Sequence, residues 1–304
     1  MDPITFITGV ELIVPGSIGT IAEVLGDGTG RAVKCRWPGL LPQIRAACPN
    51  ALILTRPSDN EGMDAKQMLD GFRTWQQAFG GVEHMWVLHE ISNEPNMPGS
   101  IYDTPDGPER YEAEAAAFLS QLTEDERYKC ALGGLVSVEP FLTKTKPWAD
   151  MYNRLQERFP ELKRAAHSYG QFTPQTDTRI DNAVGQVSGK TGGAWVTEVG
   201  TDSNGDHKFQ ATKDTFVALM GRGFGGAILF ANNDNGSFGQ YLFTPAEQRD
   251  ILSVSGVVPA PQPLPPPPPP ADDNPPPDGQ IPPPDEPATD HPNWGDHYND
   301  WAGQ

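Results

Sequence analysis

Two glutamates that follow short apolar runs are the residues best placed for chemistry. Glu94 follows the run that begins at Val87, and Glu198 follows the run that begins at Ala194. Each carboxylate is expected at the end of a strand, because it follows a short apolar run. Pro95 also disfavours the right-handed helical region for Glu94. Two carboxylates that face each other across a pocket are what acid-assisted cleavage of a glycosidic bond requires.

The elements that must hold these carboxylates alternate along the chain between apolar runs and segments of helical period. The candidate strands are 5–10, 32–37, 51–56, 85–92, 130–138, 165–169, 194–198 and 226–232. Eight such strands over about 250 residues predict an α/β fold, the (β/α)8 TIM barrel. An open doubly wound sheet is the alternative, because residues 11–31 hold only a brief helical stretch, Ile18 to Leu25.

Capping signals mark two of the helices between these strands. Asp64 and Gln67 form a capping pair that opens one helix, and Thr244 and Glu247 form another at the start of the last helix. Trp75 and Trp148 lie on apolar helical stripes, which predicts that both belong to the core.

The composition changes after residue 256, which predicts a barrel over residues 1–256 and a separate tail over 257–304. The tail holds 17 of the 32 prolines and eight acidic residues but no lysine or arginine. Such a segment is expected to be disordered or extended. Its aromatic residues leave open a docking partner, and a flexible tail with no defined partner is the alternative.

Charge, hydropathy and cysteine content indicate which partners, compartments and disulfide bonds the sequence favours. The net charge of −18 argues against nucleic acid as a partner. No apolar run is long enough for a membrane span, and Asp2 replaces the basic start of a signal peptide. Extracellular or virion-associated action is compatible with this sequence. Cys35, Cys48 and Cys130 form no CxxC pair, so buried free thiols are predicted, with a Cys35 to Cys48 bridge as the alternative.

Three short motifs at predicted strand ends resemble the pattern of the clan A glycoside hydrolases, a superfamily of retaining barrel enzymes that includes cellulases, mannanases, xylanases and β-glycosidases. They end the fourth, sixth and seventh candidate strands and read Asn93-Glu94-Pro95, His167-Ser168-Tyr169 and Thr197-Glu198. The resemblance covers residues 1 to about 255 and implies that Glu94 is the acid/base and Glu198 the nucleophile.

The resemblance also implies substrate-binding roles for the neighbours of this pair. Asn93 would bond the sugar 2-hydroxyl, Tyr169 would point its hydroxyl group at Glu198, and His167 would orient Tyr169 or the substrate. Arg56 resembles the arginine that pairs with the nucleophile, although it lies one strand away from the place that the family gives it.

Aromatic residues of the expected pocket depart from the family pattern. Members usually end strand eight with a tryptophan, whereas this chain has Leu229 to Asn233, which offers Phe230 and Asn232 instead. Trp37 is expected at the end of strand two, either as a stacking platform for a sugar or as a packing residue.

Other polar residues near the strand ends are given structural interpretations. Glu90 and Glu139 are expected to be solvated loop carboxylates, and His89 is expected to be a buried histidine without a catalytic role. Asp202 to Asp206 resembles a calcium loop, but no glutamate follows at the twelfth position, so no metal or cofactor is expected.

The sequence thus predicts a retaining glycoside hydrolase that acts on a β-linked polysaccharide, with the two carboxyl groups about 5 to 5.5 Å apart. Two other functions stay open. One is a glycan-binding barrel with little or no turnover, and the other is an adaptor that works through its proline-rich tail.

Overall fold

The computed structural model describes residues 5–12, 18–57, 62–135, 145–169, 178–200, 208–230 and 243–255. These residues form eight parallel strands that pair in sequence order and close into a barrel. The strands are β1 Ile7–Glu11, β2 Arg31–Cys35, β3 Leu52–Thr55, β4 Trp86–Glu90, β5 Cys130–Leu132, β6 Lys163–Ser168, β7 Trp195–Val199 and β8 Gly226–Leu229. The predicted TIM barrel is therefore confirmed, and the open doubly wound sheet is excluded.

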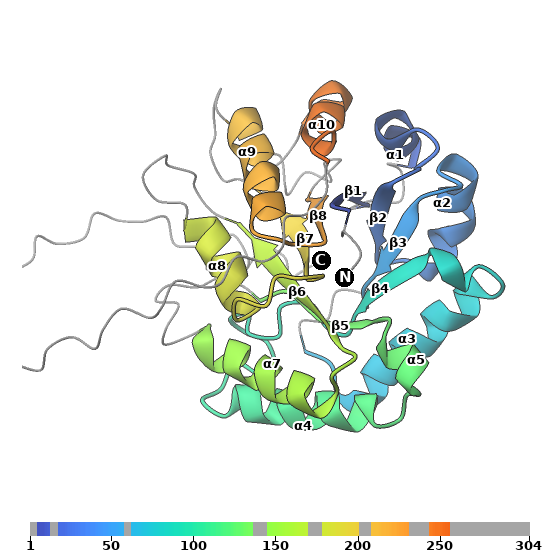
Figure 1. Ribbon diagram of the computed structural model, residues 1–304. Coiled ribbons are helices and arrows are strands. Elements are labelled where there is room, and N and C mark those ends of the chain that lie inside the picture. Colours follow the sequence, from blue (N-terminus) through green and yellow to red (C-terminus); the bar gives the residue numbers. More distant parts are fainter. Residues whose placement is uncertain are drawn as a thin grey trace, which may run out of the picture. The chain divides into compact units, whose positions relative to one another are not determined.

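Helices surround the ring of strands (Figure 1). They are α1 Ile18–Leu25, α2 Leu41–Ala47, α3 Ala65–Phe79, α4 Gly107–Leu119, α5 Glu124–Arg127, α7 Lys146–Arg158, α8 Thr178–Gln186, α9 Lys208–Gly221 and α10 Pro245–Leu252. Two short 3-10 turns, η2 Pro38–Leu40 and η3 Glu83–Met85, precede α2 and β4.

Local sequence signals explain where several helices begin. Asp64 and Thr244 both form complete capping boxes, with Gln67 and Glu247 respectively, as the sequence predicted. The short helix α1 spans the expected residues and completes the first crossover. Helices α2, α5 and α8 were not predicted from the sequence. Since α2 and α5 span only seven and four residues, they are too short to show a clear helical period.

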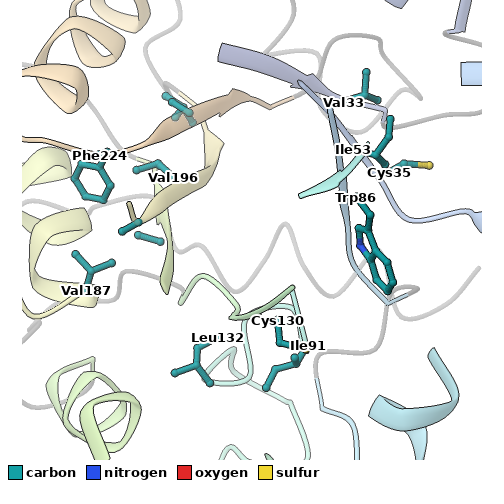
Figure 2. Close-up of a cluster of buried hydrophobic side chains, with 14 of the residues drawn as sticks. Val33, Cys35, Ile53, Trp86, Ile91, Cys130, Leu132, Val187, Val196 and Phe224 are labelled. Carbon is teal, nitrogen blue, oxygen red and sulfur yellow. The ribbon is translucent and has the colours of Figure 1, made fainter. Parts of the chain in front are cut away.

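A continuous apolar shell fills the space between the strands and the helices. Figure 2 shows part of it, with Val33, Ile53, Trp86 and Leu132 on the outer side of the barrel wall. Trp75 and Trp148 belong to this shell, as predicted. Burial of this apolar surface is the main term that holds the helices on the barrel.

The barrel interior changes from apolar to charged along the strands. Its apolar part is built from one residue of almost every strand: Ala32, Leu54, Leu88, Ala131, Ala165, Trp195 and Ile228. Because side chains alternate along a strand, residues two positions further on point into the same interior. Those residues include Lys34, Arg56, Glu90 and His167, all buried. Polar chemistry is therefore concentrated at the carboxyl ends of the strands, where TIM barrels carry their active sites.

The three cysteines are buried free thiols, which confirms the first interpretation and excludes the Cys35 to Cys48 bridge. No helix within the described ranges is long and apolar enough to cross a membrane. Residues 256–304, which include the predicted tail, lie outside the described residues.

Candidate active site

Glu94 lies in the segment that follows β4, in a backbone conformation that is rare for a residue with a side chain. Its φ angle is +38°, in the left-handed region. A hydrogen bond of 3.2 Å from its N–H to the carbonyl oxygen of Gly134 holds the turn in place. Strain of this kind persists only where the surroundings fix it, and it is common at functional sites. The conformation aims the Glu94 carboxylate at His167, whose Nδ1 lies 2.7 Å from Oε1.

Glu198 lies in β7, next to a register shift between β7 and β8. Its Oε1 accepts hydrogen bonds from Lys34 Nζ at 2.7 Å and from Arg56 Nη1 at 2.8 Å. Tyr169 donates its hydroxyl hydrogen to the other oxygen, Oε2. Burial alone would raise the pKa of Glu198, but the charges of His167, Lys34 and Arg56 outweigh burial and hold it well below its usual range. Glu198 is therefore a carboxylate at neutral pH.

Arg56 joins two of the predicted site residues. Its Nη1 donates to Asn93 Oδ1 as well as to Glu198 Oε1. The pairing with Glu198 that the resemblance implied is thus present, although Arg56 directly follows β3. It also fixes the orientation of the amide of Asn93, the residue before Glu94.

His167 lies between the two candidate carboxylates. Its Nε2 is 3.7 Å from Glu198 Oε1 and 3.8 Å from Glu90 Oε1, while Nδ1 contacts Glu94. Burial would lower the pKa of His167, but the carboxylates of Glu198 and Glu94 outweigh burial and raise the pKa to about 10. The close approach requires a glycine opposite the ring, because a Cβ on Gly134 would lie 2.0 Å from His167 Cδ2.

Glu90 corrects one expectation from the sequence. It is not a solvated loop carboxylate but a buried residue of β4, with a side chain that is 1% exposed. Its Oε2 lies 2.9 Å from Lys34 Nζ, and its Oε1 accepts a hydrogen bond from Thr197 Oγ1. The solvated interpretation failed because Glu90 shares the interior face of β4 with Leu88, and a carboxylate on that face needs a buried cation.

The nearest oxygens of Glu94 and Glu198 and a ring nitrogen of His167 all lie within 4.8 Å of one another. Among the residues that the structure describes, these three form the group of carboxylates and histidines that could hold a metal ion. Glu198 already binds Lys34 and Arg56, however, and a protonated imidazole has no lone pair for a metal. The cations that already contact these carboxylates therefore disfavour a metal ion at this position. The calcium-like loop, Asp202 to Asp206, lies outside the described residues.

The remaining predicted residues lie in different places. Trp37 does not end β2 but follows it by two residues, and it is half-buried against the apolar shell. It is not among the residues that contact the carboxylates. Phe230 follows β8 and packs edge-on against Tyr169, with ring centroids 5.4 Å apart. Asn232 and Glu139 lie outside the described residues.

His89 is buried in β4, as expected. Burial lowers its pKa to about 3, so the ring is neutral at physiological pH. Its Nδ1 lies 2.8 Å from Thr55 Oγ1, on the outer side of the barrel wall. The two histidines of the barrel wall therefore have opposite charge states, and only His167 faces the carboxylates.

The raised pKa of His167 predicts a loss of stability in alkali. A histidine whose pKa rises on folding contributes stability that is complete below the unfolded value, about 6.5, and is lost as the pH rises through the folded value. The melting temperature of the wild type should therefore fall between about pH 6.5 and pH 10. His167→Gln should remove this part of the pH dependence, measured as the difference between the two melting curves. Parallel curves over that range would contradict a charged His167.

Comparisons with known proteins agree with this geometry at the level of the fold. No family model matches the chain, and no curated protein sequence matches it. Solved structures do match. A β-mannanase from Thermomonospora fusca has a TM-score of 0.56 at 16% identity, covering 78% of this chain and 82% of that chain.

Two further structures belong to other glycoside hydrolases. Endoglucanase Cel5A of Pseudomonas stutzeri has a TM-score of 0.54 at 13% identity, covering 84% of this chain and 97% of that chain. A GH128 endo-β-1,3-glucanase from Amycolatopsis mediterranei, in complex with laminaritriose, has a TM-score of 0.54 at 11% identity, covering 80% and 98%. The chain shares its (β/α)8 fold with these three enzymes. The fold that the three sequence motifs implied is thereby confirmed.

Sequence reasoning missed two buried residues of the site, Lys34 and Glu11. Glu11 Oε1 lies 3.4 Å from both Arg36 Nη2 and Arg56 Nη2, and its Oε2 lies 3.7 Å from Lys34 Nζ. A signal was available, because Lys34 lies between Val33 and Cys35 in a strand expected to be buried. A lysine in such a strand needs a carboxylate partner.

Proposed function

We propose that the protein is a retaining glycoside hydrolase that cleaves β-glycosidic bonds of a polysaccharide. The observation that carries this proposal is that a carboxylate oxygen of Glu94 and one of Glu198 lie within 4.8 Å of each other at the carboxyl end of the barrel. Retaining enzymes keep the two carboxyl groups about 5 to 5.5 Å apart, whereas inverting enzymes leave about 6.5 to 9.5 Å for a water molecule. The short separation supports attack by Glu198 itself.

Glu198 is the nucleophile in this proposal. An ionised carboxylate is required for attack at the anomeric carbon, and the three cationic neighbours of Glu198 keep it ionised. Attack forms a bond from a Glu198 oxygen to the anomeric carbon and breaks the bond to the leaving oxygen. Water then hydrolyses the glycosyl-enzyme and releases a product with the original anomeric configuration.

Glu94, paired with His167, supplies the proton for the departing oxygen. His167 Nδ1 lies 2.7 Å from Glu94 Oε1, and a proton shared along this contact would pass through Glu94 to the departing oxygen. In the second step Glu94 accepts the proton of the attacking water. Arg56 binds Asn93 Oδ1 and thereby orients the Asn93 Nδ2 amide as a donor toward the sugar 2-hydroxyl. That hydrogen bond would strengthen in the transition state.

The structural neighbours support a β-glycan as the substrate class. The matched structures are described as a β-mannanase, an endoglucanase with bound cellobiose and endo-β-1,3-glucanases with bound laminarin oligosaccharides. They differ in sugar and linkage, so the proposal names β-linked polysaccharide and no single glycan. Residues 257–304 take no part in cleavage in this proposal.

A reducing-end assay over β-1,3-glucan, β-1,4-glucan, β-mannan and β-xylan tests the proposed function. We expect the full-length protein to release reducing ends from at least one of them, and Glu198→Gln to serve as the blank. Proton NMR of the first product would give its configuration, which should be β. An initial α product would replace retention by inversion. Binding to a glycan without release of reducing ends would favour the alternative, a glycan-binding barrel.

A further inference from the structure

Lys34 is a buried lysine shared by three carboxylates from three strands. Its Nζ lies 2.7 Å from Glu198 Oε1, 2.9 Å from Glu90 Oε2 and 3.7 Å from Glu11 Oε2. The side chain is 1% exposed, so water does not take the place of any of these contacts. An ammonium group has three N–H donors on one small charge, which suits three acceptors that converge from different directions.

A buried lysine destabilises the fold unless its charge is paired with carboxylates. A lone buried lysine would shed its proton, because burial disfavours the charged form. Burial does act to lower the pKa of Lys34, but the carboxylates of Glu11, Glu198 and Glu90 outweigh burial and raise the pKa. The ammonium group is therefore charged throughout the range in which a glycosidase works.

The groups that face Glu198 come from four strands and from the segments that follow β3, β4 and β6. They are Glu11 from β1, Lys34 from β2, Arg56 after β3, Glu90 from β4, Glu94 after β4, His167 from β6 and Tyr169 after β6. Of the cations among them, Lys34 and Arg56 hydrogen-bond to Glu198, and both use Oε1. Oε2 is left to Tyr169. The two oxygens of Glu198 therefore have different tasks.

We propose that Lys34 is a positioning residue for the reaction, which binds Glu198 Oε1, keeps the carboxylate ionised and presents Oε2 to the anomeric carbon. Glu90 and Glu11 anchor the ammonium group from the opposite side. Arg56 shares Oε1 but also binds Asn93 and lies 3.4 Å from Glu11 Oε1, whereas Lys34 Nζ lies beside the carboxylates of Glu198, Glu90 and Glu11. The effect of Lys34 on catalysis rests on the proposed function. Its effect on the ionisation of Glu198 can be measured without turnover.

Lys34→Met, which keeps most of the length of the side chain and removes its charge, is the decisive variant. Removing a cation at hydrogen-bond distance should raise the pKa of Glu198 by about one unit or more. The acidic limb of kcat/KM against pH should move to higher pH by that amount. We expect kcat to fall by about 10-fold to 100-fold while KM changes little, because the substrate does not touch Lys34. Lys34→Arg should keep the acidic limb of the wild type.

Loss of Lys34 also leaves Glu90 as a buried, unpaired carboxylate, which destabilises the fold. The double variant Lys34→Met with Glu90→Gln removes both charges and should regain much of the lost melting temperature. It should not regain the position of the acidic limb, because Glu198 Oε1 still lacks the hydrogen bond from the Lys34 ammonium group. This contrast separates positioning of Glu198 from simple neutralisation of Glu90.

A second readout does not need activity. Carbon-13 NMR of δ-labelled glutamate can follow the Glu198 carboxyl group, assigned as the signal that disappears in Glu198→Gln. In the wild type this signal should stay that of a carboxylate down to the lowest pH at which the fold persists, and in the double variant it should titrate at a higher pH. Equal titration in both proteins would overturn the inference. If the wild type cleaved no glycan, the proposed function would fail while the titration still decided the role of Lys34.

Discussion

Glu198→Ala should abolish cleavage of every glycan that the wild type hydrolyses, with a loss in kcat of at least about 10⁴-fold. Glu90 is not expected to replace the proposed nucleophile, because it is bound to Lys34 and Thr197. Kinetic assays on a polysaccharide and on an activated aryl glycoside should show the same loss. Activation of the leaving group cannot replace a missing nucleophile.

A small external nucleophile provides the sharpest check on this assignment. Azide can enter the space that Glu198→Ala vacates and attack the anomeric carbon from the same side as the lost carboxylate. The product from an activated β-glycoside should then be the α-glycosyl azide. Retained activity of Glu198→Ala, or a β-azide as the rescued product, would remove Glu198 from the role of nucleophile.

Folding of the variant must be tested separately, because Glu198 also neutralises buried cations. Removing one partner of a buried ion pair costs about 3 to 5 kcal/mol. Lys34 and Arg56 would both lose an acceptor in Glu198→Ala. Glu198→Gln keeps the side-chain volume and one acceptor oxygen, so it should melt at a higher temperature than Glu198→Ala while remaining equally inactive. That pair of variants separates catalysis from stability.

The fold could be predicted from the sequence because its signals are local and repeated. Each strand is a short apolar run, and capping residues such as Asp64 and Thr244 mark helix starts. Strand ends were predicted less well. The sixth strand begins at Lys163, two residues before the predicted start, because a lysine at the edge of an apolar run looks like a loop residue. The structure satisfies Lys163 through the carbonyl oxygen of Val87.

The upper part of the site could be predicted because strand ends converge in a parallel barrel. The structure brings together Glu94, Glu198, His167, Tyr169, Arg56 and Asn93. The charged layer beneath them could not be predicted residue by residue. Whether Glu90 is solvated or buried depends on which face of β4 points inward and on a lysine 56 positions earlier in the sequence. Such pairings are fixed by tertiary structure and leave no local pattern.

The charged layer explains why the two candidate carboxylates differ. Lys34 and Arg56 both contact Glu198, whereas Glu94 contacts His167. The charges of His167, Lys34 and Arg56 favour the ionised form of Glu198. In the proposed mechanism these contacts assign the role of nucleophile to Glu198 and that of acid/base to Glu94.

Glu94→Ala should therefore damage cleavage in a way that depends on the leaving group. Unactivated polysaccharide needs a proton on the departing oxygen, so kcat/KM should fall by about 10²-fold to 10⁴-fold. An aryl glycoside whose phenol is a strong acid departs without that proton and should lose far less in the first step. Glu90→Gln is the matched control, because it changes a buried carboxylate of the same cluster that has no leaving group to protonate. Its losses should be equal on both substrates.

Backbone strain at Glu94 gives this prediction an independent control on stability. The φ angle of +38° disfavours alanine as it disfavours glutamate, whereas glycine adopts it readily. Glu94→Gly should therefore be more stable than Glu94→Ala by up to about 1 kcal/mol. Both variants should nevertheless have the same dependence on the leaving group, since both lack the proton donor. If the loss followed the melting temperature instead, or were equal for activated and unactivated substrates, Glu94 would be a structural residue and the proton donor would have to be sought elsewhere.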